Sequence, residues 1–360
     1  MLFVLLSHFG YSYFLNQRDL LPTSMRLVGM VASPTFAVIS GLLIGFLYRT
    51  HANDFARLQI RFADRGLFLL SVGHLAILGA HVGWSRMSCL FLTDTIGVWM
   101  VLEPWLVARI RPRDRVATGL ALFTLTWLMI LFWRPQAGVA TVVKDTLFGS
   151  LTARTYGYSF PLLPWFAVAF ASSALGDRLG AYHLNGDEDA FRRLLQRTAA
   201  CALGAAAVLN AVYHAAKYVS HNNVLVLAVH PLASPFQKEP PSPVYMLFYG
   251  AIGLGLVCAW LHLERNHLAP RIMNRAVAFG QTSLVVFVIQ WYVYFPLLRF
   301  SRGYLPYSWA WPVYFIASVA IVVWSARLCY RRGYNRFATI GLQDLWEYRA
   351  PEISSSLSRN

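Results

Sequence analysis

The sequence predicts an all-α polytopic membrane protein with about ten transmembrane helices and both termini in the cytoplasm. Three observations predict this class: an apolar composition, a series of long apolar runs, and an uneven distribution of arginine. Of 360 residues, 57% are hydrophobic and 13% are charged, and the mean hydropathy is +0.48. Because a soluble domain carries about 25% charged residues, the composition favours a chain that resides in a bilayer.

Apolar runs recur along most of the chain. A helix needs about 20 apolar residues to cross the roughly 30 Å hydrocarbon core of a bilayer. The expected spans are Met1–Phe14, Val28–Tyr48, Leu67–Val82, Met87–Val107, Val116–Trp133, Pro161–Ala181, Ala199–Tyr218, Val244–Leu263, Ala276–Phe300 and Tyr307–Leu328. We therefore read residues 1–330 as one membrane domain and residues 331–360 as a short basic cytoplasmic tail.

The first run is shorter than a full span. At 1.5 Å per residue, Met1–Phe14 reaches about 21 Å. It lacks the basic segment and the small-residue cleavage site of a signal peptide. We expect the natural chain to begin upstream of Met1.

Basic residues are distributed unevenly between the two sides. The chain has 31 Lys and Arg against 16 Asp and Glu, an excess that can indicate nucleic-acid binding. With the N-terminus in the cytoplasm, 21 of the basic residues fall on the cytoplasmic side and 10 on the opposite side. This is the positive-inside pattern, so the charge predicts orientation and no nucleic-acid partner.

Two connections on the non-cytoplasmic side are longer than the others. They are Arg134–Phe160 and Ser220–Pro243. Loops of about 25 residues are typical of lids and binding loops. The four cysteines lie in or beside apolar runs without a CxxC pair, which favours helix packing and predicts no metal site.

Ionisable residues inside spans are costly and therefore informative. His8 lies toward the outer half of the first helix, where a neutral imidazole can act as a general base; the alternative is a packing histidine bonded to a carbonyl. Asp94 begins the fourth span, where its carboxylate can either orient an imidazole or cap the helix. His74 is expected to be structural, and Glu103 is expected to pair with an arginine.

Arg61 and Arg65 lie four residues apart, on one face of a helix that enters the membrane from the cytoplasm. Two such guanidinium groups suit a phosphate-bearing ligand; the alternative is that they only set orientation. The sequence has no Walker loop, GxSxG, HExxH or Rossmann glycine pattern, so ATPase, serine hydrolase and zincin functions have no support.

The order of several motifs resembles that of a known family. After the histidine come SPTFAVISGL (33–42), the arginine-rich segment 61–70, YSFPLLPW (158–165), PPSPVY (240–245) and FGQTSL (279–284). The order resembles the transmembrane acyltransferase superfamily over residues 1–330. Its branches include acyltransferase 3 proteins, enzymes that succinylate periplasmic glucans, and the catalytic domain of heparan-α-glucosaminide N-acetyltransferase; the last two look closest.

The resemblance implies transfer of an acyl group, acetyl or succinyl, from cytoplasmic acyl-CoA to a glycan or glycolipid on the far side of the membrane. It also implies membrane lipid as a partner and a bacterial inner-membrane location, and it leaves open a homo-oligomer. The candidate site residues are His8 and Asp94 for catalysis, Arg61, Arg65 and Ser40 for acyl-CoA binding, and Gln290, Tyr158 and Trp165 for acceptor binding.

This sequence departs from the family pattern at two places. Relatives carry an Arg-Gly segment about ten residues before the histidine, which would lie before Met1 here. They often carry a histidine where this chain has Gln290, and glutamine can hydrogen-bond but cannot shuttle a proton. Two alternatives therefore stay open: a transporter or flippase of a lipid- or sugar-linked substrate, which predicts broken helices and midplane ion sites, and a non-catalytic subunit of a glycan-assembly complex.

Overall fold

The computed structural model describes residues 1–14, 18–81, 90–151, 160–219, 230–268, 270, 276–277, 280, 282–297, 310–333 and 339–342. These residues form helices and no β-strand. The α-helices are α1 (Leu2–Tyr13), α2 (Leu20–Gly29), α3 (Ala32–Thr50), α4 (Phe55–Phe68), α5 (His74–His81), α6 (Leu92–Arg109), α7 (Pro112–Phe132), α8 (Val139–Leu147), α9 (Leu162–Leu184), α10 (Glu188–Val219), α12 (His230–Ala233), α13 (Pro243–Arg265), α15 (Ser283–Tyr292) and α17 (Trp311–Arg331). A 3-10 turn, η1 (Ala52–Asp54), and two π-helical turns, η2 (Leu69–Gly73) and η3 (Val293–Leu297), join them.

Six helical stretches are long and apolar enough to cross a membrane, which agrees with the predicted all-α, multi-pass class. They are Leu20–Thr50, Ala52–Ala80, Pro112–Phe132, Glu188–Val219, Pro243–Arg265 and Trp311–Arg331. Helices α6 and α9 carry charged residues along their length and are not among the six. About half of the residues of each helix are buried, and some of their charged groups have polar partners on other helices, as Asp94 has in His74 and Asp177 in Arg115.

The second span begins earlier than the apolar pattern predicts. The pattern places its start at Val28, whereas the helix begins at Leu20. Helix α2 continues into α3 because Met30 and Val31 keep helical backbone angles. The Tyr245 hydroxyl donates to the Met30 carbonyl over 2.9 Å, which ties this junction to α13.

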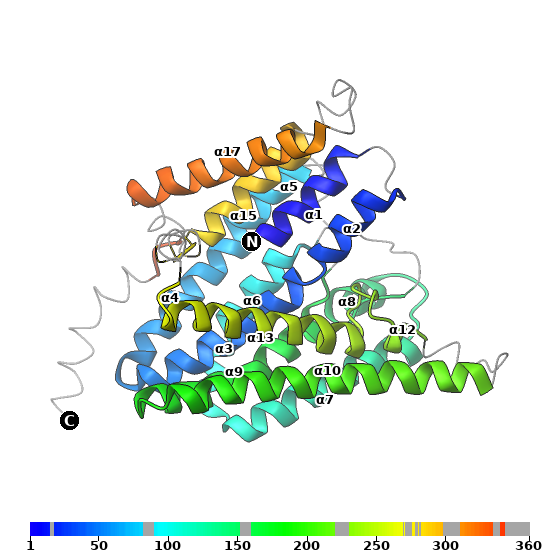
Figure 1. The fold of residues 1–360 in the computed structure, drawn as a ribbon. Helices are drawn as coiled ribbons and strands as arrows, with labels where there is room; N and C mark the ends of the chain where they lie inside the picture. The colour runs from blue at the N-terminus through cyan, green and yellow to red at the C-terminus, as the bar shows by residue number, and fades with distance from the viewer. Residues whose placement is uncertain are drawn as a thin grey trace.

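The centre of one half of the bundle is the crossing of α3 and α9 (Figure 1). A Cβ atom added at Gly41 or Gly45 of α3 would overlap the backbone carbonyl of Ala169 or Ser173 in α9. The contact is reciprocal, because a Cβ atom added at Gly176 of α9 would overlap the backbone carbonyl of Leu42 in α3. Small residues spaced four apart on both helices allow this close approach.

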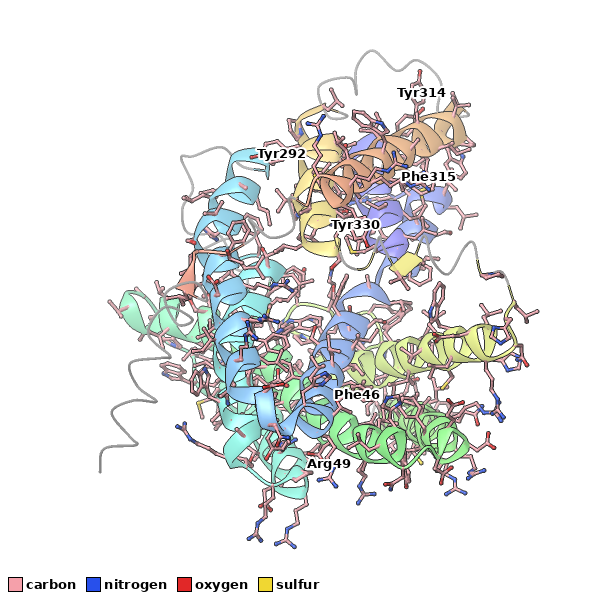
Figure 2. The ribbon with its side chains drawn as sticks, turned by 90° about the vertical axis from the view of Figure 1, so that its left-hand side faces the viewer. Phe46, Arg49, Tyr292, Tyr314, Phe315 and Tyr330 are labelled. Atoms are coloured by element: carbon pink, nitrogen blue, oxygen red, sulfur yellow. The ribbon has the colours of Figure 1, made fainter. Side chains whose placement is uncertain are left out.

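The remaining helices surround that crossing in two groups. Helices α7, α10 and α13 lie around α9, whereas α1, α5, α15 and α17 lie side by side in the upper part of Figure 1. Figure 2 shows Phe46 and Arg49 at the end of α3, where the Phe46 ring lies 5.4 Å from that of His183 in α9. It also shows Phe315 of α17, whose ring lies 5.2 Å from that of Phe9 in α1.

The helix ends gather on two opposite sides. The ends of α3, α13 and α17 and the starts of α4 and α10 lie on the left of Figure 1, while α8 and α12 lie on the right. The predicted long connections, Arg134–Phe160 and Ser220–Pro243, thus each contain a short helix. Two of the arginine-rich connections, the one between α3 and α4 and the one between α9 and α10, lie on the left side.

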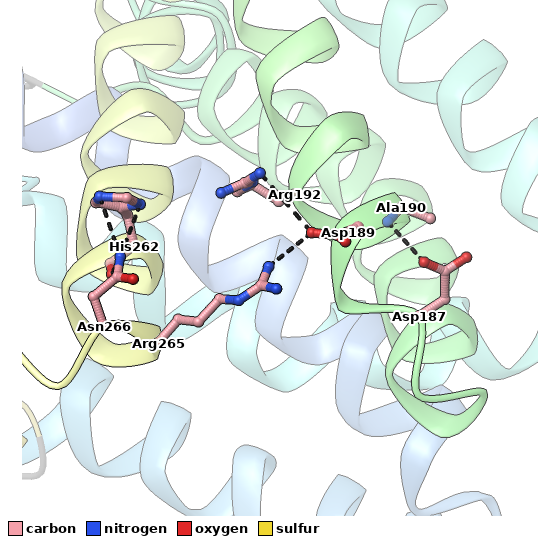
Figure 3. Close-up of polar contacts among 7 residues, drawn as sticks. All are labelled: Asp187, Asp189, Ala190, Arg192, His262, Arg265 and Asn266. Atoms are coloured by element: carbon pink, nitrogen blue, oxygen red, sulfur yellow. Dashed lines mark hydrogen bonds and ion pairs between the residues drawn. The ribbon is translucent and has the colours of Figure 1, made fainter.

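An exposed ion pair fastens the start of α10 to the end of α13 on the left side (Figure 3). The Arg265 guanidinium donates to Asp189 over 2.7 Å, and Arg192 lies 3.9 Å from the same carboxylate oxygen. The Asp187 carboxylate accepts from the Ala190 amide over 2.9 Å, as a helix N-cap does.

Candidate functional site

A cavity of about 330 Å³ lies between α3, α4, α6 and α15. Helices α3, α4 and α6 contribute residues spaced three or four apart, so that one face of each points into the cavity, whereas α15 contributes its first turn. Its walls are mostly apolar. The polar residues on its walls are Ser40, Arg65, Thr93, Thr282 and Ser283.

Two residues predicted to bind acyl-CoA therefore line the same cavity. Ser40 comes from α3, and Arg65 comes from α4, where its residue is exposed. Arg61 is exposed one turn earlier and does not line the cavity within the described part of the chain. The FGQTSL motif contributes Thr282 and Ser283, at the start of α15, to the opposite wall.

The π turn η2 separates Arg65 from the histidine that follows on the same helix. Leu69 begins this turn and still lines the cavity, whereas His74 follows the turn and contacts α6. A π turn inserts one residue into the helical register and often occurs at functional sites. The distance from Arg65 to His74 along the helix axis is about 13 Å.

Asp94 pairs with His74 and not, in any contact the structure shows, with His8. The His74 Nδ1 atom lies 2.9 Å from Asp94 Oδ2, and the Phe91 amide donates to the same oxygen over 2.8 Å. Phe91, and not Asp94, is thus the N-cap of α6. Asp94 lies at the third position of the helix, where its carboxylate accepts from the N-cap amide and contacts an imidazole. Thr93, its neighbour in the chain, lines the cavity.

Aromatic contacts connect this pair to His8. The His74 ring lies 5.7 Å from Phe91, Phe91 lies 5.6 Å from Trp291, and Trp291 lies 5.0 Å from His8, centroid to centroid. We call these five residues, His8, His74, Phe91, Asp94 and Trp291, the two-histidine cluster. The Tyr292 hydroxyl, seen in Figure 2, donates to the Ala76 carbonyl over 2.8 Å and holds α15 against α5 beside it.

Gln290 precedes Trp291 and is completely buried. Neither its amide nitrogen nor its amide oxygen has a hydrogen-bond partner among the described residues. Because a buried amide without partners costs about 1–3 kcal/mol, this side chain is suited to bind a polar group that the described residues do not supply. It lies one turn beyond Phe287, which lines the cavity.

Other predicted residues lie elsewhere. His8 does not line the cavity within the described residues; it packs between Trp291 and Phe295, 5.5 Å from the latter ring. Trp165 is fully buried in the core, 6.4 Å from the Tyr245 ring, and is not on the cavity wall. Tyr158 lies outside the described residues.

The PPSPVY motif has a structural role in the described chain. The Ser242 hydroxyl accepts from the Tyr245 amide over 2.8 Å and caps α13, and Pro243 occupies the first turn. Proline is favoured there because its missing N–H is not needed.

The sequence predicts a structural role for His74, and not a functional one. The only signal available was its position as an ionisable residue inside a span. Its contact with Asp94 depends on the packing of α5 against α6, 20 positions away in sequence, which no local pattern indicates. The described residues bring together no group of three or more potential metal ligands.

Comparisons with known proteins add no family assignment. The chain matches no family model, no curated protein and no solved structure. The site itself is an apolar cavity with a cationic side chain, Arg65, on its wall. The imidazole of His74, in contact with the Asp94 carboxylate, lies next to it.

Proposed function

We propose that the protein is an acyl-CoA-dependent membrane acyltransferase. It transfers an acetyl or succinyl group from cytoplasmic acyl-CoA to a hydroxyl of a glycan or glycolipid on the far side of a bacterial inner membrane. In this proposal the chain spans the membrane about ten times with both termini inside; each of the ten predicted spans contains part of a described helix, which supports the count.

The cavity with Arg65 on its wall carries the proposal. An acyl-CoA combines anionic phosphates with a long, largely uncharged arm that ends in a thioester. A guanidinium binds phosphate through charge-assisted hydrogen bonds, and the apolar walls suit the arm and the acyl group. The cavity also reaches Thr93, beside Asp94, so a bound thioester would approach the two-histidine cluster.

The acceptor side is supported by buried polar groups. Gln290 offers a donor and an acceptor without partners in the described chain, and hydroxyl-rich sugars satisfy such groups. The family resemblance implies His8 as the general base, and the structure adds His74 in the same cluster.

Arg65 and Arg61 provide a matched test, since both are exposed arginines of α4 and only Arg65 lines the cavity. Binding of acetyl-CoA and succinyl-CoA is measured by titration calorimetry on protein in nanodiscs. We expect Arg65→Gln to weaken binding about 10- to 100-fold, because a hydrogen bond to a charged group contributes about 1.5–3 kcal/mol. Arg61→Gln should change it less than about threefold.

Equal effects of the two substitutions would argue that the cavity is not the donor site. Wild-type protein that binds neither acyl-CoA would contradict the proposed function itself. Mass spectrometry of surface glycans from cells with and without the protein then identifies the transferred group.

Transport of a lipid- or sugar-linked substrate is the second candidate, and Glu103 is the observation that favours it. Glu103 is fully buried in α6, and neither carboxyl oxygen has a hydrogen-bond partner among the described residues. Buried ionisable groups inside membranes often mark proton or ion pathways. Substrate flux driven by a proton gradient in proteoliposomes, lost in Glu103→Gln, would favour transport over acyl transfer.

A further inference from the structure

Two imidazoles belong to the two-histidine cluster, and the resemblance assigns a role to only one of them. The structure shows what holds the other. His74 opens α5 directly after the π turn, and its Nδ1 atom lies 2.9 Å from Asp94 Oδ2. This places the ring, the carboxylate and the cavity wall at Thr93 next to one another.

The carboxylate itself is fixed. Asp94 is buried, with a side-chain exposure of 7%, and its Oδ2 atom also accepts from the Phe91 amide. A rigid carboxylate that accepts from Nδ1–H holds one tautomer of the imidazole and stabilises the imidazolium when it forms. The Nε2 atom of His74 then carries the lone pair, and it makes no hydrogen bond within the described part of the chain.

We propose that His74, oriented by Asp94, is the general base of the acyl transfer, and this inference rests on the proposed function. Nε2 of His74 takes the proton of the acceptor hydroxyl while the hydroxyl oxygen bonds to the thioester carbonyl carbon. The carbon–sulfur bond then breaks, and the departing sulfur takes the proton from Nε2 to leave as the free thiol of coenzyme A. Asp94 stays ionised throughout.

His8 keeps a different task in this scheme. It comes from α1 and is separated from His74 by the rings of Trp291 and Phe91. Its ring contacts Trp291, which follows Gln290 in α15, and in the scheme it contributes to acceptor binding. His74 is therefore a catalytic residue, Asp94 is a positioning residue, and His8 and Gln290 bind the sugar.

The scheme is tested with matched glutamine substitutions, since glutamine keeps a hydrogen-bonding group but cannot carry the proton. Proteoliposomes receive succinyl-CoA or acetyl-CoA on one side and a mixture of glucose and N-acetylglucosamine oligosaccharides on the other. We expect His74→Gln to lower kcat at least about 100-fold, the typical contribution of a general base. His8→Gln should raise the KM for the oligosaccharide and leave kcat within about threefold.

Asp94→Asn separates a positioning role from a structural one. An asparagine amide donates to Nδ1 and moves the proton to Nε2, so that the base is lost while the fold is kept. We expect a fall in kcat as large as in His74→Gln, no further fall in the double variant, and unchanged acyl-CoA binding in all three. Carbethoxylation of His74 by diethyl pyrocarbonate, followed by mass spectrometry, should slow in Asp94→Asn while that of His8 does not.

The outcomes are distinguishable. If kcat falls in His8→Gln and is kept in His74→Gln, the base is His8, and the inference is overturned while the proposed function stands. If carbethoxylation of His74 is unchanged in Asp94→Asn, the carboxylate does not orient the ring, which also overturns the inference. Wild-type protein that transfers no acyl group to any acceptor overturns the proposed function and the inference together.

Discussion

At the scale of single residues, the described chain contains a buried arginine with several simultaneous partners. Arg115, 1% exposed, donates to the carbonyls of Ile110 and Val107 over 2.8 Å each and thereby binds the free carbonyls at the end of α6. Its guanidinium also lies 3.7 Å from Asp177 of α9 and 5.3 Å from the centre of the Tyr48 ring. One side chain thus joins α3, α6, α7 and α9.

Replacing this arginine tests its contribution to stability. Arg115→Met should destabilise the protein by about 2–4 kcal/mol, because it leaves the partly buried Asp177 without its partner and the buried carbonyls at the end of α6 without their donor. Arg113→Met is the control, since the Arg113 side chain is 78% exposed, and it should change stability by less than about 0.5 kcal/mol. Unfolding in detergent followed by tryptophan fluorescence measures both, and similar stabilities of the two variants would contradict this role.

Residue types inside spans predicted part of the site. Asp94 was expected either to orient an imidazole or to be the N-cap of the helix. Phe91 occupies the N-cap, and the Asp94 carboxylate, three residues later, accepts from the Phe91 amide and lies 2.9 Å from His74. The identity of the imidazole was not predictable, since His8 and His74 are equally ionisable in the sequence and only packing decides which one meets Asp94. The roles of His8, Arg61 and Trp165 stay predictions.

At the scale of elements, the α3–α9 crossing is the contact most sensitive to an added methyl group. Gly41→Ala puts a Cβ where the Ala169 carbonyl lies, so the helices must separate. We expect a loss of about 1–3 kcal/mol or more.

Gly204→Ala in α10 provides the matched control, because a Cβ there meets nothing within 4 Å. It should be neutral or stabilising by up to about 1 kcal/mol, since alanine is the better helix former. The midpoint of thermal unfolding in detergent separates the two cases, and a Gly41→Ala protein as stable as Gly204→Ala would show that the crossing is loose.

The hydrophobic pattern predicted the existence of the helices better than it predicted the residues at which they begin. The run from Val28 missed the first eight residues of α2, because Arg26, Ser24 and Thr23 lower the local hydropathy although they lie in a continuous helix. Arg26 and Ser24 bond locally, to Thr23 and to the Leu20 carbonyl. Such local hydrogen bonds allow polar residues to lie at the end of an apolar helix. The hydropathy averaged over a stretch of sequence does not detect these bonds.

At the scale of the whole molecule, the two sides of the bundle carry different connections. The turn at Ala52–Asp54 lies on the side with the ends of α3, α13 and α17, and α8 lies on the other (Figure 1). The alternation of the expected spans predicts which connections share a side, and the arginine count predicts which of the two sides faces the cytoplasm. The packing of α3 against α9 was not predictable from the sequence. It depends on glycines such as Gly41 and Gly176, whose spacing indicates a close contact only once the two helices are known to cross.

Labelling of single cysteines tests the orientation. In a variant without native cysteines, Ala137→Cys, exposed between α7 and α8, should react with a membrane-impermeant maleimide in intact cells. Ala52→Cys, also exposed, should react only after the membrane is permeabilised, because the positive-inside pattern predicts that the arginine-rich side faces the cytoplasm. The reverse pattern would place both termini outside and contradict the proposed direction of acyl transfer.

The π turn at Leu69–Gly73 has a consequence for how one helix serves two chemical tasks. One inserted residue rotates everything beyond it by about 100° relative to a regular α-helix. Arg65 before the turn and Leu69 at its start face the cavity, and His74 beyond it faces Asp94. The helix therefore changes phase between the half proposed to bind an anion and the half proposed to accept a proton, so that each half can face its own partner independently of the other.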